Sequence, residues 1–113
     1  MTDYKPGDIV LVPYPFGERA GGRKRPVLVI SSPEFNQVTG EVVIAQVTSR
    51  ISPDAHPGDY SIEGWKEANL PRASMVRGRL ATVKGSLILR RLGELTDAEL
   101  QAAVKTLRTA VHF

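Results

Sequence analysis

The first half of the chain carries two runs of apolar, β-branched residues that predict strands. The sequence "GDIVLVPY" (7–14) opens directly after a proline–glycine turn signal. The sequence "RPVLVIS" (25–31) follows a loop that holds three glycines. This second run is apolar at consecutive positions, so both of its faces would be buried. We therefore expect it to be a central strand of a sheet.

The middle of the chain predicts further strands separated by turns. "EVVIAQVTS" (41–49) is a third expected strand, and the segment before it is expected to turn, with Asn36 and Gly40 as breakers. A long polar loop leads to "DYSIEG", which fits a short edge strand, and "ASMVRGRLATV" (73–83) predicts a longer one. "SLILRRLGEL" (86–95) fits a helical turn or a strand, and both interpretations stay open.

The end of the chain predicts one helix. The sequence Thr-Asp-Ala-Glu at 96–99 fits a capping box, in which the threonine hydroxyl and the glutamate carboxylate satisfy free N–H groups at a helix start. Apolar residues then recur at helical spacing, namely Leu100, Val104, Leu107 and Val111. The whole chain thus predicts five or six short strands closed by a C-terminal helix. In so small a chain, a strongly curved antiparallel barrel removes exposed strand edges economically.

Composition narrows the class of protein. The length of 113 residues predicts a single domain, residues 1–113, and 42% hydrophobic residues are ordinary for a soluble globular chain. A net charge of +3 and a pI of about 9.5 favour polyanionic partners. The absence of cysteine excludes disulfides and thiolate metal sites. No signal pattern or membrane-length apolar run is visible, so we expect a cytoplasmic protein.

Two basic segments suggest contacts with phosphate. Arg23, Lys24 and Arg25 stand between the glycine-containing loop and the second expected strand, with Pro26 fixing the backbone behind them. A second segment, from Arg72 to Arg91, contains cations and no acidic residue; its members are Arg72, Arg77, Arg79, Lys84, Arg90 and Arg91. This segment would follow a nucleic-acid backbone or would simply form a solvated strand face with internal ion pairs, and the sequence favours neither.

Several motifs, in order, resemble the MazF/PemK/Kid family, the toxin components of bacterial toxin–antitoxin pairs. These motifs are "GDIVLVPYPFGE", "RKRPVLVISS", "VIAQVTSR" and "LPRASMVRGRLATV", and the closing "RRLGELTDAEL" is also similar to that family. The resemblance covers nearly the whole chain. It implies a small SH3-like antiparallel barrel of the CcdB/PemK type that forms a homodimer. It also implies metal-free cleavage of single-stranded RNA, leaving a 2′,3′-cyclic phosphate and a 5′-hydroxyl, and an antitoxin partner.

The resemblance assigns catalytic roles to three residues. Arg25 matches the family's catalytic arginine, and a guanidinium can hold two oxygens of a pentacoordinate phosphate through parallel hydrogen bonds. Thr48 matches the catalytic hydroxyl residue, and Glu18 lies in the loop where some members carry a functional glutamate. The acceptor of the 2′-hydroxyl proton stays open between Glu18 and His56, since an imidazole titrates near neutrality. Without the resemblance, Arg25 would be an exposed strand-end cation and Thr48 an ordinary strand residue.

The remaining candidates concern binding. The expected RNA-binding residues are Arg23, Lys24, Ser49, Arg50, His56, Arg77 and Arg79. Phe16, Tyr60 and Trp65 offer rings that stack on unpaired bases or fill a small barrel, and for Trp65 the second use is favoured. No metal site and no cofactor are expected, since neither histidine has a metal-ligand spacing. The alternative function is a non-catalytic toxin on the same barrel that docks onto gyrase, or a silent RNA- or DNA-binding module.

Overall fold

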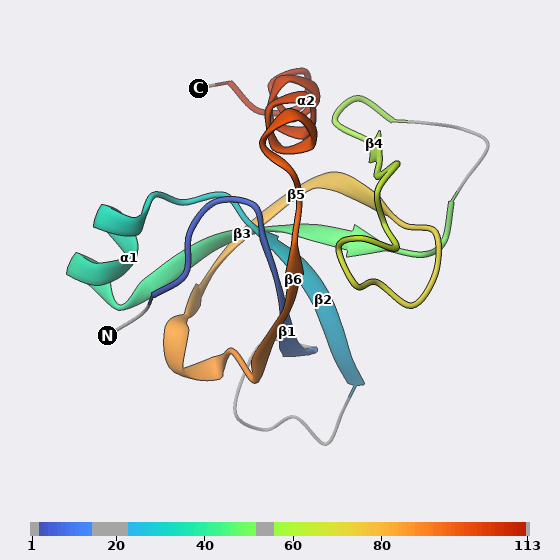
Figure 1. The fold of residues 1–113 in the computed structure, drawn as a ribbon. Helices are drawn as coiled ribbons and strands as arrows, with labels where there is room; N and C mark the ends of the chain where they lie inside the picture. The colour runs from blue at the N-terminus through green and yellow to red at the C-terminus, as the bar shows by residue number, and fades with distance from the viewer. Residues whose placement is uncertain (1–2, 15–22, 52–55, 113) are drawn as a thin grey trace.

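The computed structural model describes residues 3–14, 23–51 and 56–112 and shows one curled antiparallel sheet with a helix across it (Figure 1). The hydrogen-bonded strand order is β4-β5-β3-β2-β1-β6. The strands are β1 (Asp8–Tyr14), β2 (Arg23–Val29), β3 (Glu41–Thr48), β4 (Tyr60–Ser61), β5 (Met75–Lys84) and β6 (Arg90–Glu94). The helices are α1 (Pro33–Thr39), the 3₁₀ turn η1 (Gly85–Leu87) and α2 (Asp97–Leu107). The mainly β fold with a C-terminal helix is confirmed.

The strand β2 is central, as its continuous apolar run predicted. It lies between β1 and β3, and Val27, Leu28 and Val29 are at most 2% exposed. β2 begins at Arg23 rather than at the predicted Arg25, because β1 extends far enough to pair with Arg23. The pairing with β3 begins only at Val27, so the missing N–H of Pro26 interrupts no β2–β3 ladder.

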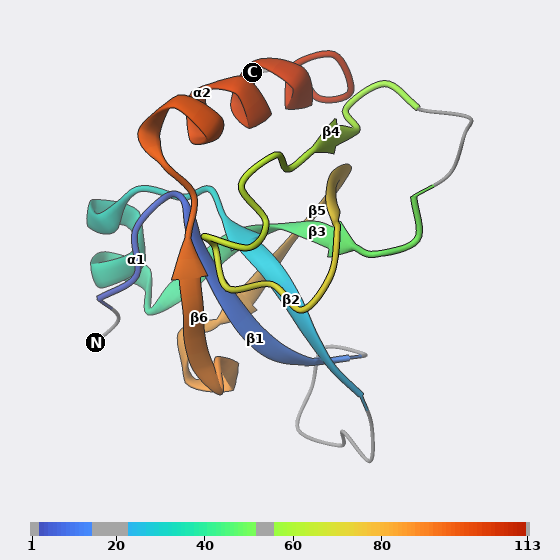
Figure 2. The ribbon, with the colours of Figure 1, turned by 45° about the vertical axis from the view of Figure 1, so that its right-hand side comes forward.

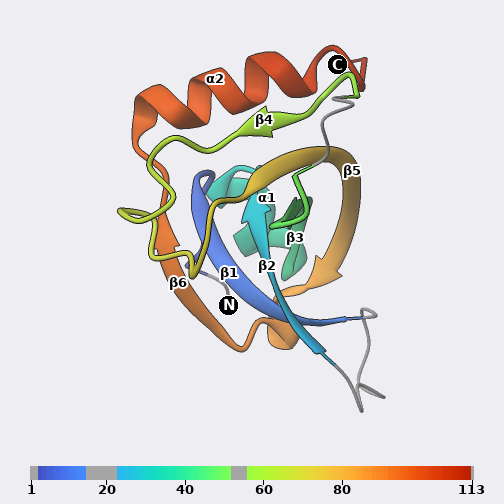
Figure 3. The ribbon, with the colours of Figure 1, turned by 90° about the vertical axis from the view of Figure 1, so that its right-hand side faces the viewer.

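Two apolar clusters lie on opposite faces of the sheet. The first cluster packs Ala45 and Val47 of β3 against Ala103 and Leu107 of α2. Figure 2 shows α2 and β4 together on this side of the sheet. The second cluster includes Ile44 and Val42 from the other face of β3. Its further members come from β1, β2, β5 and the residue after η1, namely Val10, Val12, Val27, Val29, Val83 and Ile88. Figure 3 shows the long β5 bending around the edge of this curl.

The segment after β2 is a helix, so the predicted turn at Asn36 and Gly40 is wrong. Ser32 caps α1 by accepting a hydrogen bond from Phe35 N at 3.1 Å, and Gly40 ends the helix in the left-handed conformation, φ 72°. Asn36 is fully buried, and its Nδ2 donates to Tyr4 O at 2.8 Å. Asn36 therefore anchors the N-terminal segment instead of breaking the chain.

The two predictions near the C-terminus are resolved in different ways. The ambiguous segment 86–95 contains both alternatives, since η1 leads into β6. The cap of α2 is confirmed, because Thr96 Oγ1 accepts from Glu99 N at 3.2 Å. The Glu99 carboxylate departs from the capping box: it accepts from Glu63 N at 2.9 Å, from Gly64 N at 2.8 Å and from the Tyr60 hydroxyl. Among the helices of the described residues, none is long and apolar enough to cross a membrane.

Candidate active site

Arg25 is held by a backbone that is fixed on both sides. It pairs with Val12 on β1, and the buried residues that follow Pro26 anchor β2 in the middle of the sheet. Its side chain is half-buried and lies on the same face of β2 as Val27, because alternate residues of a strand share a face. The backbone that carries the Arg25 guanidinium is therefore rigid, and a preorganised hydrogen-bond donor requires such a support.

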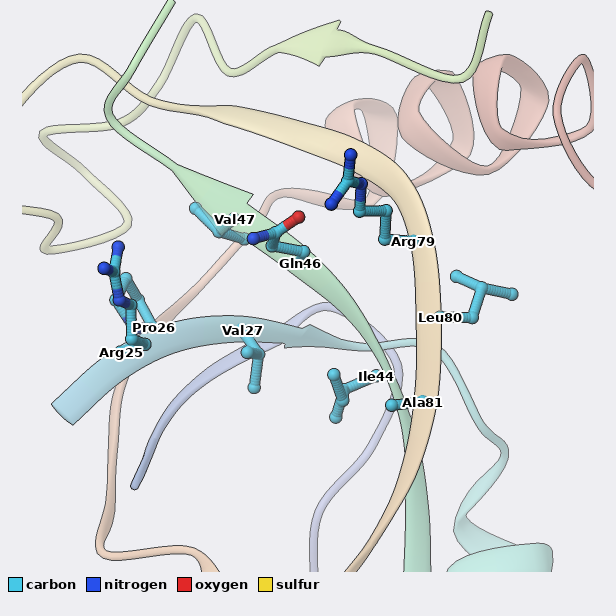
Figure 4. A pocket seen from close by; sticks show the side chains of 9 residues that line it. All are labelled: Arg25, Pro26, Val27, Ile44, Gln46, Val47, Arg79, Leu80 and Ala81. Atoms are coloured by element: carbon cyan, nitrogen blue, oxygen red, sulfur yellow. The ribbon is translucent and has the colours of Figure 1, made fainter. Parts of the chain in front are cut away.

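A pocket of about 140 Å³ lies beside Arg25, between β2, β3 and β5 (Figure 4). Its polar lining side chains are Arg25, Gln46 and Arg79, and the rest of the lining is apolar: Pro26, Val27, Ile44, Val47, Leu80 and Ala81. Figure 4 shows the Gln46 amide between the two guanidinium groups in this view. The pocket thus combines an apolar floor with two cations, a combination that suits a flat apolar ring attached to an anion.

The predicted hydroxyl residue stands close to this pocket without lining it. Thr48 ends β3 and is 9% exposed, and its Oγ1 accepts a hydrogen bond from Arg50 N at 3.1 Å. The hydroxyl keeps its own proton for donation. The last pair between β2 and β3 is Val27 with Gln46. Two residues further along, Arg25 and Thr48 stand on the same face of adjacent antiparallel strands.

His56 belongs to a second cavity of about 130 Å³. Arg77 Nη2 lies 3.2 Å from His56 Nδ1, and Arg77 Nε lies 3.4 Å from Oδ1 of Asp59, a carboxylate whose side chain is 2% exposed. Because a guanidinium only donates, the contact with Arg77 is a hydrogen bond when Nδ1 is the acceptor; the same Nδ1 also lies 3.9 Å from Oδ2 of Asp59. The two cavities share Arg79 in their linings, so Arg79 stands between them.

The other predicted binding residues are spread over the ends of the strands. Arg23 and Lys24 are exposed at the start of β2, and Ser49 and Arg50 are exposed after β3. Glu18 lies in residues 15–22, outside the described part of the chain. No group of three possible metal ligands occurs among the residues that the structure describes.

The segment from Arg72 to Arg91 does not form a single stripe. Arg72 precedes β5, and the other cations lie on β5 or on β6, which are separated by three strands in the sheet order. Arg91 Nη1 lies 3.0 Å from Oδ1 of Asp8, a carboxylate that is 1% exposed, and this pairing raises the pKa of Arg91. Arg91 therefore acts in the fold, whereas Arg77 and Arg79 face the two cavities.

Two of the three aromatic candidates, Tyr60 and Trp65, lie among the described residues, and both pack against the first cluster. Trp65 packs against the first cluster, as favoured from the sequence. Tyr60 also packs there, and burial, followed by its bond to Glu99, raises the pKa of Tyr60. Phe16 lies outside the described residues. The rings of Tyr60 and Trp65 are partly buried, and Lys66 Nζ lies 5.4 Å from the centroid of the Trp65 ring.

Sequence reasoning missed Gln46 and Asp59. Gln46 carried a usable signal, because it is the one polar side chain within the apolar run "VVIAQV". Asp59 gave no signal of its own, since its partners Arg77 and His56 come close only in the folded chain.

Comparison with known proteins identifies the family of this chain and solved structures with the same fold. Residues 5–111 match the family described as PemK-like, MazF-like toxin of type II toxin-antitoxin system. No significantly similar curated protein was found. MazF from Deinococcus radiodurans is 22% identical over 100% of both chains, with a TM-score of 0.75.

Two complexes show the same fold. A MazE–MazF structure from Deinococcus radiodurans has a TM-score of 0.77 at 19% identity, covering 100% of this chain and 99% of that chain. A mycobacterial endoribonuclease in complex with its cognate antitoxin has a TM-score of 0.73 at 20% identity, covering 95% of this chain and 93% of that chain. The family model, which spans nearly the whole sequence, shows that this chain belongs to the PemK-like, MazF-like toxins of type II toxin–antitoxin systems.

Proposed function

We propose that this chain is a metal-independent, sequence-selective endoribonuclease that cleaves single-stranded RNA. The observation that carries the proposal is the pocket with Arg25 and Arg79 over an apolar floor, on a family fold shared with proteins described as endoribonucleases. Single-stranded RNA presents unstacked bases beside each phosphate, so it matches a pocket of this composition.

The proposed reaction is a transesterification within the RNA. The ribose 2′-oxygen loses its proton and forms a bond to the adjacent phosphorus. The bond from phosphorus to the 5′-oxygen then breaks, and that oxygen takes up a proton. The products are a 2′,3′-cyclic phosphate and a 5′-hydroxyl. Arg25 stabilises the pentacoordinate phosphate through two charge-assisted hydrogen bonds, and the Thr48 hydroxyl donates a further one.

Glu18 is the proposed acceptor of the 2′-hydroxyl proton. His56 suits this role less, because Arg77 Nη2 lies 3.2 Å from its Nδ1 and occupies that nitrogen. A carboxylate keeps free lone pairs and can accept a proton at neutral pH. Arg23, Lys24, Ser49, Arg50, His56, Arg77 and Arg79 are proposed to contact the RNA around the cut site.

Digestion of RNA by the purified protein, with EDTA present, tests the proposal. We expect cleavage to continue without divalent ions and the fragments to carry 2′,3′-cyclic phosphate and 5′-hydroxyl ends. Loss of cleavage in EDTA with recovery on adding a divalent ion would contradict the metal-free mechanism. Absence of cleavage together with inhibition of gyrase would favour the docking alternative.

We also propose that the chain acts as a homodimer. One barrel of this size has little concave surface, and two copies would form a groove that neither has alone. Light scattering at micromolar concentration should give twice the chain mass. A fully active monomer would contradict this part of the proposal.

The proposed regulator is an acidic antitoxin. The cations at the start of β2 and on β5 would pair with the carboxylates of an unfolded antitoxin segment instead of with phosphates. Co-expression with the neighbouring reading frame, followed by titration with a non-cleavable RNA, tests this competition. RNA and antitoxin should weaken each other's binding, and both should bind less tightly as salt increases. Simultaneous binding without mutual weakening would place the antitoxin on another surface.

A further inference from the structure

Gln46 contains a buried acceptor that has no partner. Its Oε1 is shielded from solvent and forms no hydrogen bond with any residue that the structure describes, although the Arg79 guanidinium lines the same pocket. Buried polar atoms in folded proteins are nearly always paired, and an unpaired one destabilises the fold. An acceptor left unpaired inside a pocket points to a ligand that supplies the donor.

The backbone around Gln46 is arranged to leave this pocket open. β3 and β5 pair at Ala45 with Leu80 and again at Val47 with Val76. Gln46 alone stands between these pairs on β3, and it faces a bulge on β5 formed by Arg77, Gly78 and Arg79. Bulges of this kind re-aim side chains and interrupt a ladder. Here the pairing of β3 with β5 is interrupted opposite Gln46, and Arg79 of the bulge lines the pocket.

The chain around the bulge is closely packed. A Cβ added at Gly78 would lie 2.7 Å from the Cβ of Ala110, just beyond α2, and 3.6 Å from the Cα of Gly58. Only glycine allows the bulge to pass so close to these neighbours. The close packing of Gly78 against Ala110 and Gly58 therefore holds the bulge, and with it the pocket beside Gln46, in place.

We propose that Gln46 reads one unpaired nucleobase of the RNA by accepting a hydrogen bond from an N–H group on the edge of that base. The inference rests on the proposed function, since it takes RNA as the ligand. The apolar walls, including Ile44 and Leu80, would contact the base, while Arg25 and Arg79 hold the flanking phosphates (Figure 4). An acidic peptide fits less well, because the carboxylate side chains that pair with the arginines bring no flat N–H-bearing ring to the apolar walls beside Gln46.

The test compares Gln46→Leu with the wild type in binding to 2′-O-methyl oligonucleotides of A, C or U alone, which cannot be cleaved. We expect the wild type to prefer one base and Gln46→Leu to lose about five- to hundredfold of that preference. The thermal melt of Gln46→Leu should be unchanged or higher, since an unpaired acceptor has been removed. The matched control is Gln101→Leu, at an exposed position on α2, which should keep the wild-type preference.

Each other outcome has a clear meaning. An unchanged preference, or an equal loss for all three oligonucleotides, would overturn the role of Gln46. A loss of antitoxin binding alone would show that the occupant is a protein and would also overturn it. If the wild type binds RNA selectively through Gln46 but cleaves none, the proposed function fails and this inference stands. If it binds no RNA, both fail.

Discussion

The start of α2 and the pocket beside Arg25 differ in how fully their polar acceptors are hydrogen-bonded. At the helix, the Glu99 carboxylate accepts three hydrogen bonds, from Tyr60, Glu63 and Gly64. In the pocket, the Gln46 amide oxygen is shielded from solvent and accepts none from the described residues. The polar groups at the start of α2 hold the fold together, whereas the pocket leaves the Gln46 acceptor without a partner among the described residues.

The difference shows where stability and function should separate. Substitutions at the helix should lower the free energy of unfolding and leave the chemistry intact in the folded fraction. Substitutions in the pocket should change the reaction or its selectivity with little effect on stability. The predictions below test this separation, beginning with the largest expected effect.

Arg25→Lys should behave almost like Arg25→Ala. Lysine keeps the charge but loses the two-pronged geometry, and the loss of a preorganised donor costs ~10²–10³ in rate. Single-turnover cleavage of RNA, with the thermal melt measured in parallel, checks this. Arg72→Lys, at an exposed position outside the pocket, is the matched control and should keep the wild-type rate. A near-normal rate for Arg25→Lys would reduce Arg25 to a general phosphate contact.

Glu99→Ala should give the largest loss of stability among the predicted variants. It leaves the partly buried Tyr60 hydroxyl and Gly64 N–H without their acceptor, while water can reach the exposed Glu63 N–H, and we expect a loss of about 2–3 kcal/mol in the free energy of unfolding. This corresponds to a fall in Tm on the order of 10 °C. Asp97→Ala removes a carboxylate from the same helical turn without removing these bonds, so it should cost only about 0.3–1 kcal/mol. Equal losses in the two variants would mean that Glu99 acts only through the helix dipole.

Much of the fold was predictable, because strands and α2 depend on local patterns. The continuous apolar run of β2 predicted that this strand lies in the centre of the sheet. The capping residue Thr96 predicted where α2 begins. The helix α1 was missed although Ser32, Pro33 and Gly40 are typical cap residues, because seven mixed residues form no apolar stripe. Local turn signals were given more weight than the caps at both ends.

The candidate site was only partly predictable. Arg25 and Thr48 were predicted as site residues through the resemblance, and residue patterns alone gave them ordinary roles. The pocket depends on the break in pairing between β3 and β5, which is a property of strand register and not of either strand alone. The ion pair between Asp59 and Arg77 likewise depends on the folded chain, and neither residue predicts it alone.

Thr48→Ala should reduce cleavage by about tenfold to a hundredfold, because one donor to the developing phosphate charge is lost. The melt should stay close to that of the wild type, since Arg50 is exposed and water can replace the acceptor for its N–H. Thr48→Ser restores the hydroxyl and should recover most of the rate. A large fall in Tm for Thr48→Ala with an unchanged rate would place Thr48 with the structural residues instead.

Gly78→Ala should produce the smallest effect and should connect the two regions. The new methyl group would lie 2.7 Å from the Cβ of Ala110, so the segment after α2 must move away from the bulge, and we expect a loss of about 1 kcal/mol. Because Arg79 extends from the same bulge, RNA affinity should fall as well. The matched control is Gly40→Ala, where a left-handed φ of 72° makes alanine costly although nothing lies within 4 Å. Gly40→Ala should lower the Tm similarly and leave RNA affinity unchanged, so an equal loss of affinity in both variants would show that stability alone explains the effect.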